Sequence, residues 1–97
     1  MAQVPKFLEA YREIDPVLYE TVVKVIEMAN APGVLDRKTK LLITLALDVF
    51  KGADEGVRVL AAQAREVGAT EQELAEAIRL AYYVAGFDPL KTALAAF

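Results

Sequence analysis

The 97-residue chain contains no cysteine and no histidine, and this composition limits the chemistry that it can support. Without cysteine there is no disulfide, no thiolate nucleophile and no thiolate metal ligand. Without histidine the chain lacks the usual general base at neutral pH and the commonest metal ligand. A cation site made of carboxylates alone remains possible, but no group of Asp and Glu residues has the spacing for one. We therefore expect neither a bound metal nor a cofactor.

The remaining polar residues offer two small candidate clusters. Lys51 and Arg58 lie on either side of Gly52 and could bind a small anion, although such side chains are more often the solvated ends of amphipathic residues. Thr44 and Asp48 are one helical turn apart and could share a hydrogen bond. Asp48, if buried, would need such a partner or would stay protonated.

All of these residues belong to segments with a helical pattern, and no stretch alternates between polar and apolar residues for long enough to predict a strand. We expect an all-α fold, a single domain of about six helices covering 1–97. An N-terminal helix pair should occupy 1–33, a core 34–86 and a short last helix 87–97.

Sequence signals at the helix ends support these boundaries. The residues Thr70, Glu71, Gln72 and Glu73 form a capping box, the strongest local signal in the chain. Aspartates suit the N-cap position and proline suits the first turn, whereas glycine favours helix ends. The predicted starts are Asp15-Pro16, Asp36, Thr70 and Asp88-Pro89, and the predicted ends are Gly52, Gly68 and Gly86.

Hydrophobic residues make up 56% of the chain, which is more than so small a subunit can bury alone. The segment 41–50 is apolar almost all round, so we expect that helix to be buried on most sides at the centre of the subunit. The surplus apolar surface predicts a subunit interface. Candidate interface residues are Tyr83, Leu90, Leu94 and Phe97, the last three in an apolar tail that needs a cover.

Charge and hydropathy argue against two classes of partner. The net charge is −3, with 11 basic and 14 acidic residues interspersed, so no basic stripe points to nucleic acid. No apolar run approaches the roughly 20 residues of a membrane-spanning helix. The charged segment from Lys6 to Glu13 does not resemble a secretory signal. We expect a cytoplasmic protein whose main partner is itself.

The order of these motifs resembles the carboxymuconolactone decarboxylase family, including its alkyl hydroperoxidase D-like branch. In that family a helix start of the type Leu-x-x-x-x-Lys-Glu-Leu-Ile precedes a Gly-Cys-x-x-Cys-x-x-x-His segment. A start of the type Gly-Ala-Thr-Glu-Glu-Glu-Ile then follows. The matching residues, spread over 34–86, are Leu35, Lys40, Leu42, Ile43, Gly52, Gly68, Ala69, Thr70, Glu71, Glu73, Ala77 and Arg79.

The positions at which the family carries its catalytic residues differ here. The resemblance places Ala53 and Gly56 at the two cysteines, Leu60 at the histidine and Leu41 at the glutamate of the proton relay. Alanine and glycine supply neither the thiolate nor the resolving thiol that peroxide reduction needs, and leucine cannot move a proton. The two leucines are expected to fill the ancestral pocket with hydrocarbon.

Three other residues, Glu55, Tyr82 and Tyr83, are expected near the pocket or on the helix beside it. Glu55 could act as a base, although a carboxylate in the first turn more simply compensates the helix dipole. Tyr82 is expected in the core with its hydroxyl at the edge. Tyr83, about 100° further round the helix, is expected to be more exposed.

Three functions are compatible with the sequence. The first is a catalytically inactive, self-assembling protein on this fold, either a degenerate paralogue or an engineered assembly scaffold. The resemblance implies packing around a threefold axis, so a homotrimer or hexamer is expected. The second is a decarboxylase-type enzyme or small-molecule binder with an unrecognised site, which is less favoured because no convergent polar groups line a pocket. The third is a module that binds another protein through Phe7, Tyr11 and Tyr19.

Overall fold

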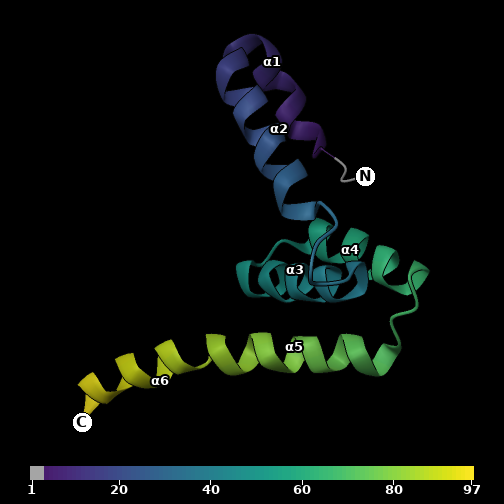
Figure 1. Ribbon diagram of the computed structural model, residues 1–97. Helices are drawn as coiled ribbons and strands as arrows, with labels where there is room; N and C mark the ends of the chain where they lie inside the picture. Colours follow the sequence, from purple (N-terminus) through teal and green to yellow (C-terminus); the bar gives the residue numbers. More distant parts are fainter. Residues whose placement is uncertain (1–3) are drawn as a thin grey trace. The chain divides into compact units, whose positions relative to one another are not determined.

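The computed structural model describes residues 4–97, and every regular element among them is helical (Figure 1). This confirms the predicted all-α fold. The chain divides into two compact units, residues 1–34 and 35–97, which are described separately. Among the residues described, no helix combines the length and the hydrophobicity needed to cross a bilayer.

The first unit is a helical hairpin. A 3₁₀ helix, η1 (Lys6–Ala10), continues into the short α1 (Tyr11–Ile14), which packs against α2 (Pro16–Asn30). Asp15 caps α2 as predicted, because its carboxylate accepts a hydrogen bond from the backbone N–H of Leu18 at 3.0 Å. The guanidinium of Arg12 lies 4.8 Å from the centre of the Tyr19 ring and so holds α1 against α2.

The second unit is built around α3 (Arg37–Lys51), which packs against both α4 (Asp54–Glu66) and α5 (Glu71–Ala85). Leu45 of α3 is 1% exposed and lies at the centre of the core. Alanines on the facing helices let the backbones approach closely. The buried core residues are Leu41, Leu45, Ala64, Ala69, Leu74 and Ala77.

The predicted caps of this unit are present. Asp36 accepts from the backbone N–H of Thr39 at 2.8 Å, and Thr70 and Glu73 form both bonds of the capping box. Gly52 and Gly68 have φ angles of 78° and 95°, which only glycine adopts without strain. These two turns reverse the chain and bring α3, α4 and α5 side by side.

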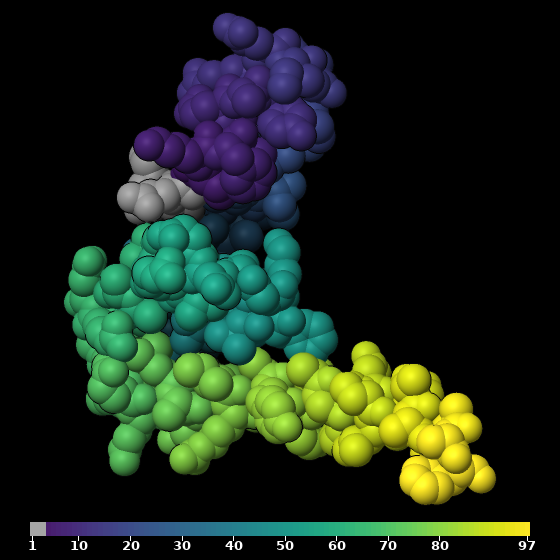
Figure 2. Space-filling view, turned by 180° about the vertical axis from the view of Figure 1, so that it is seen from behind, coloured from purple at the N-terminus to yellow at the C-terminus, as the bar shows by residue number. Residues whose placement is uncertain are grey.

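α5 ends before Gly86, as predicted, but the start of the last helix differs from the prediction. Gly86 has a right-handed helical conformation (φ −74°, ψ −15°), and α6 (Phe87–Ala93) begins at the next residue. Asp88 and Pro89 consequently lie inside the first turn of α6 instead of opening it. The 3₁₀ helix η2 (Leu94–Ala96) follows. Together α5, α6 and η2 form an extended arm that projects beyond α3 and α4 (Figures 1 and 2).

The expected burial of the third helix on most sides is wrong for this subunit. α3 buries Leu41 and Leu45 but leaves Ile43, Leu47 and Phe50 about half exposed or more. The reason is geometric, because α4 and α5 cover only part of its circumference and no other element of the second unit packs on the rest. An apolar strip therefore remains uncovered on the central helix.

Candidate functional site

An open groove of about 470 Å³ lies along the C-terminal half of α3 and the length of α4. Val49, Val57 and Ala61 contribute to its apolar surface. One acidic side chain comes from α3, and one acidic and two basic side chains come from α4. The lining residues are Asp48, Val49, Gly52, Ala53, Asp54, Val57, Arg58, Ala61 and Arg65. This is the hollow in which a small molecule could be held.

Asp48 differs from the other charged residues of the groove, which are exposed. Its side chain is half-buried and lies over Gly56 of α4, where a Cβ atom would overlap with the carboxylate oxygen Oδ2. The expected hydrogen bond from Thr44 is not formed, since the Thr44 hydroxyl instead donates to the backbone carbonyl of Lys40 at 2.7 Å. Asp48 thus has room only because residue 56 is glycine.

The two arginines that line the groove are engaged in ion pairs. Arg58 donates to Glu55 at 2.6 Å, and Arg65 donates to both carboxylate oxygens of Glu71 at 2.8 and 2.9 Å. Hydrogen bonding and charge attraction by Glu71 raise the pKa of Arg65 above its usual value. Glu55 is exposed and paired on the surface of α4, which does not suit a base aimed at a bound substrate.

The predicted anion site is not assembled. Arg58 lines the groove, whereas Lys51 is exposed and is not among the lining residues. Arg58 is already paired with Glu55. Among residues 4–97, no group of three or more acidic side chains is placed to hold a metal ion.

The four positions singled out by the resemblance fall in two places. Leu41 is 5% exposed and belongs to the core, and Leu60 is half-buried against that core. Ala53 lines the groove and Gly56 lies beneath Asp48 at its edge. The two leucines therefore add to the hydrophobic packing of the second unit, and the groove lies beside the other two positions.

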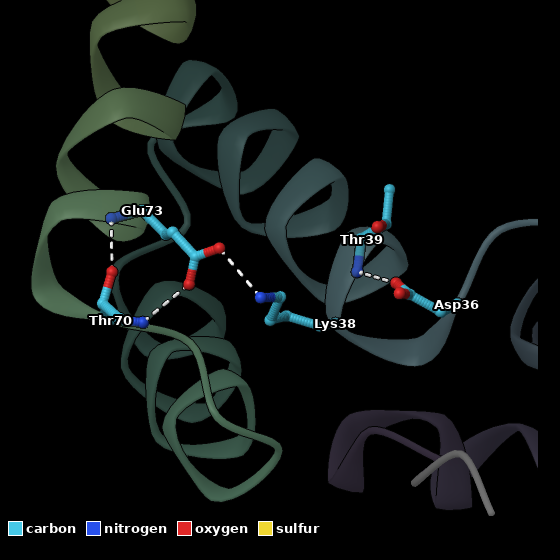
Figure 3. Close-up of polar contacts among 5 residues, drawn as sticks. All are labelled: Asp36, Lys38, Thr39, Thr70 and Glu73. Carbon is cyan, nitrogen blue, oxygen red and sulfur yellow. Dashed lines mark hydrogen bonds and ion pairs between the residues drawn. The ribbon is translucent and has the colours of Figure 1, made fainter.

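A second polar cluster ties the start of α3 to the start of α5 (Figure 3). The Lys38 ammonium donates to Glu73 at 2.8 Å, and the same carboxylate accepts from the backbone N–H of Thr70 at 2.9 Å. The bond from Lys38 and the bond from Thr70 lower the pKa of Glu73 below its usual range. Sequence reasoning identified the capping box but missed Lys38, because nothing local connects residues 35 positions apart.

The tyrosines of α5 are arranged differently from the expectation. Tyr82 is 78% exposed, so its assignment to the core is wrong. Its neighbour Ala81 takes the buried position against the core instead, and a rotation of about 100° turns Tyr82 outward. Tyr83 is 59% exposed, less than Tyr82, so the expectation that it is the more exposed of the two is also wrong. Its ring meets that of Phe87 edge-on, with centroids 4.8 Å apart. The other predicted interface residues, Leu90, Leu94 and Phe97, are exposed along the arm.

The model of the carboxymuconolactone decarboxylase family matches residues 16–97, which include both α2 and the whole second unit. The chain belongs to this family. The match is longer than the segment 34–86 that contains the motifs, and it confirms the resemblance to this family that the motifs indicate.

A solved structure supports the same fold. The crystal structure of a protein from Methanobacterium thermoautotrophicum, determined as a structural-genomics target, superposes with a TM-score of 0.78 at 35% sequence identity. The similarity covers 95% of this chain and 99% of that one. No curated protein matches the chain significantly.

Proposed function

We propose that this chain is a non-catalytic, self-assembling member of the carboxymuconolactone decarboxylase family. The observation that carries the proposal is the amount of apolar surface that the second unit leaves uncovered on its central helix and on the α5–α6 arm. Monomeric proteins rarely expose large contiguous apolar patches unless a partner binds there. A further copy is the simplest cover, because every copy brings the same uncovered surface.

Two observations support the non-catalytic part of the proposal. The chain has no thiol and no imidazole, and the positions matching the family's proton-transferring residues carry Leu41 and Leu60, which contribute to hydrophobic packing. The basic residues that line the groove, Arg58 and Arg65, are paired with Glu55 and Glu71, so they are not free to polarise a substrate. Peroxide reduction by thiols is excluded on chemical grounds, since there is no sulfur nucleophile.

The assembly is tested by static light scattering coupled to size-exclusion chromatography. We expect three or six times the subunit mass of 10.6 kDa, in line with the threefold packing that the family resemblance implies. A monomer of 10.6 kDa at micromolar concentration would overturn the self-assembly.

The catalytic part is tested by assaying peroxide reduction and lactone decarboxylation beside a family member that retains its thiols and histidine. We expect no turnover above the buffer background. Turnover that persists after repeated purification, and that is lost in an Asp48→Ala variant, would overturn the proposal and place a working site in the groove.

A further inference from the structure

The exposed residues of the α5–α6 arm follow a spacing that is specific to paired helices. Large apolar side chains recur at intervals of 3, 4, 3, 4 and 3 residues from position 80 to position 97. This is the a/d pattern of a coiled coil, in which one seam of a helix packs against another helix. The residues, here called the arm seam, are Leu80, Tyr83, Phe87, Leu90, Leu94 and Phe97.

The arm seam lies apart from the surface with which α5 packs on its own subunit. The core-facing residues of α5 are Leu74, Ala77 and Ala81, whereas every residue of the arm seam has more than half of its surface exposed. The edge-to-face contact of Tyr83 with Phe87 spans Gly86 and shows that the seam stays on one side there. The helices of the second unit therefore leave the side chains of the arm seam uncovered.

The order of residues along the arm seam makes it complementary to itself when two arms run antiparallel. With a twofold axis near residues 88 and 89, Leu80 faces Phe97 of the second copy, Tyr83 faces Leu94, and Phe87 faces Leu90. Each layer then combines one aromatic ring with one leucine, so all layers have similar volume. A parallel pair would instead stack like on like, which gives oversized aromatic layers and smaller leucine layers.

The residues beside the seam also suit the antiparallel arrangement. Val84 would lie next to the alkyl stem of Lys91 of the second copy, and Gly86 next to Ala93, where small residues allow close approach. Asp88 and Lys91 are the charged residues between positions 80 and 97, and neither belongs to the arm seam, so the pairing buries no charge in it. Six side chains of this size would bury on the order of 600–900 Å² in each copy, close to the roughly 800 Å² per partner of a standard interface.

The other uncovered strip of the second unit is a poorer match for the arm. Ile43, Leu47 and Phe50 of α3 also have heptad-like spacing, but they supply three residues against the six of the arm seam. Docking the arm there would leave half of it exposed.

We propose that two copies of this chain associate through their arm seams, as an antiparallel helix pair about a twofold axis. The inference rests on the self-association proposed above and specifies one of its contacts. A twofold contact of this kind would join two threefold rings into a hexamer.

Disulfide trapping tests this geometry with little background, because the chain has no cysteine of its own. In the double variant Tyr83→Cys/Leu94→Cys, the antiparallel pair places each cysteine opposite the other type in the second copy. Within one chain the two positions are about 16 Å apart along the helix, too far for a disulfide. We expect the double variant to form covalent dimers on mild oxidation and each single variant to stay uncrosslinked.

The matched control is Tyr82→Cys/Leu94→Cys, since Tyr82 is exposed beside the seam but not part of it. Crosslinking of Tyr83→Cys alone would show parallel arms and overturn the antiparallel geometry. No crosslinking of the double variant in a protein that light scattering shows to be oligomeric would overturn the arm contact. A monomer by light scattering would instead overturn the proposed self-assembly itself.

A second measurement does not depend on oxidation. Tyr83→Asp places a charge in the seam and should halve the mass of the assembly, whereas Tyr82→Asp should leave the mass unchanged. Both side chains are exposed, so neither variant disturbs the core, and circular dichroism checks that each remains folded. Equal masses for the two variants would overturn the proposal.

Discussion

The side chain of Asp48 explains why residue 56 is a glycine. Glycine inside a helix is destabilising by roughly 0.5–1 kcal/mol relative to alanine, so a physical reason for Gly56 is needed. The structure supplies it, because the carboxylate of Asp48 occupies the space that a Cβ on residue 56 would fill. The sequence alone could not reveal this contact, which joins two helices across a turn.

The two residues should therefore be energetically coupled. In an Asp48→Ala background, Gly56→Ala should stabilise the protein by roughly 0.5–1 kcal/mol. Alanine favours the helical conformation more than glycine does, and no carboxylate then occupies the space of its Cβ atom. In the unmodified chain Gly56→Ala should stabilise the protein less, or destabilise it, because the Asp48 side chain must rotate away from the new Cβ atom. Urea unfolding of the four proteins of this cycle measures the coupling. Equal effects of Gly56→Ala in both backgrounds would contradict it.

Glu73 predicts a dependence of stability on pH. Its pKa is lowered in the folded protein by the bond from Lys38 and the capping bond from Thr70, relative to roughly 4.3 in an unfolded chain. A carboxylate with a lowered folded pKa contributes its stabilisation in full above the unfolded pKa and loses it as the pH falls further. The unfolding midpoint in urea should thus decrease as the pH is lowered from about 5 towards 3.

The variant Glu73→Gln isolates this contribution. It should be less stable than the parent protein near pH 7 and should lose less stability on acidification, because no proton binds at position 73. Glu76→Gln is the matched control, since Glu76 is an exposed residue of the same helix. If Glu73→Gln and the parent protein showed parallel pH profiles, the ion pair with Lys38 would not contribute to stability.

At the scale of elements, the reliability of the sequence prediction depended on whether the deciding interactions were local. The caps at Asp15, Asp36 and Thr70 bond to backbone groups three residues away, and all three were predicted correctly. The start of α6 was not, because Asp88-Pro89 fits a first helical turn in more than one register.

Burial proved harder to predict than helix boundaries. The uniformly apolar sequence of α3 does not indicate which of its sides α4 and α5 will cover, and the adjacent Tyr82 and Tyr83 differ by one position of rotation. The groove was also beyond prediction, since its lining residues come from both α3 and α4 and are brought together only by folding.

The two sides of α3 should respond differently to truncation. Leu45→Ala removes a fully buried side chain and should cost about 2–5 kcal/mol of unfolding free energy. Leu47→Ala, on the uncovered strip, should cost less than half as much within the subunit while weakening association. Chemical unfolding at one protein concentration, together with light scattering, separates the two effects. Equal losses of stability with no change in mass would contradict the division of α3 into a core face and an interface face.

At the scale of the whole molecule, the chain combines a small core with a large uncovered apolar surface. Its fully buried side chains are few, and several of the core residues are alanines, which contribute little area. An assembled protein gains the additional burial that the isolated subunit lacks. Folding and association should consequently be linked, and the apparent stability should depend on protein concentration.

Thermal unfolding at several concentrations measures this linkage. The midpoint temperature should rise by a few degrees, roughly 2–6 °C, for each tenfold increase in concentration, because mass action favours the associated folded state. Tyr83→Asp should make this dependence shallower by removing the arm contact, and Tyr82→Asp should retain it. A midpoint that is independent of concentration in the parent protein would mean that the exposed strips contribute nothing to stability, since only a folded state that is already monomeric behaves in that way.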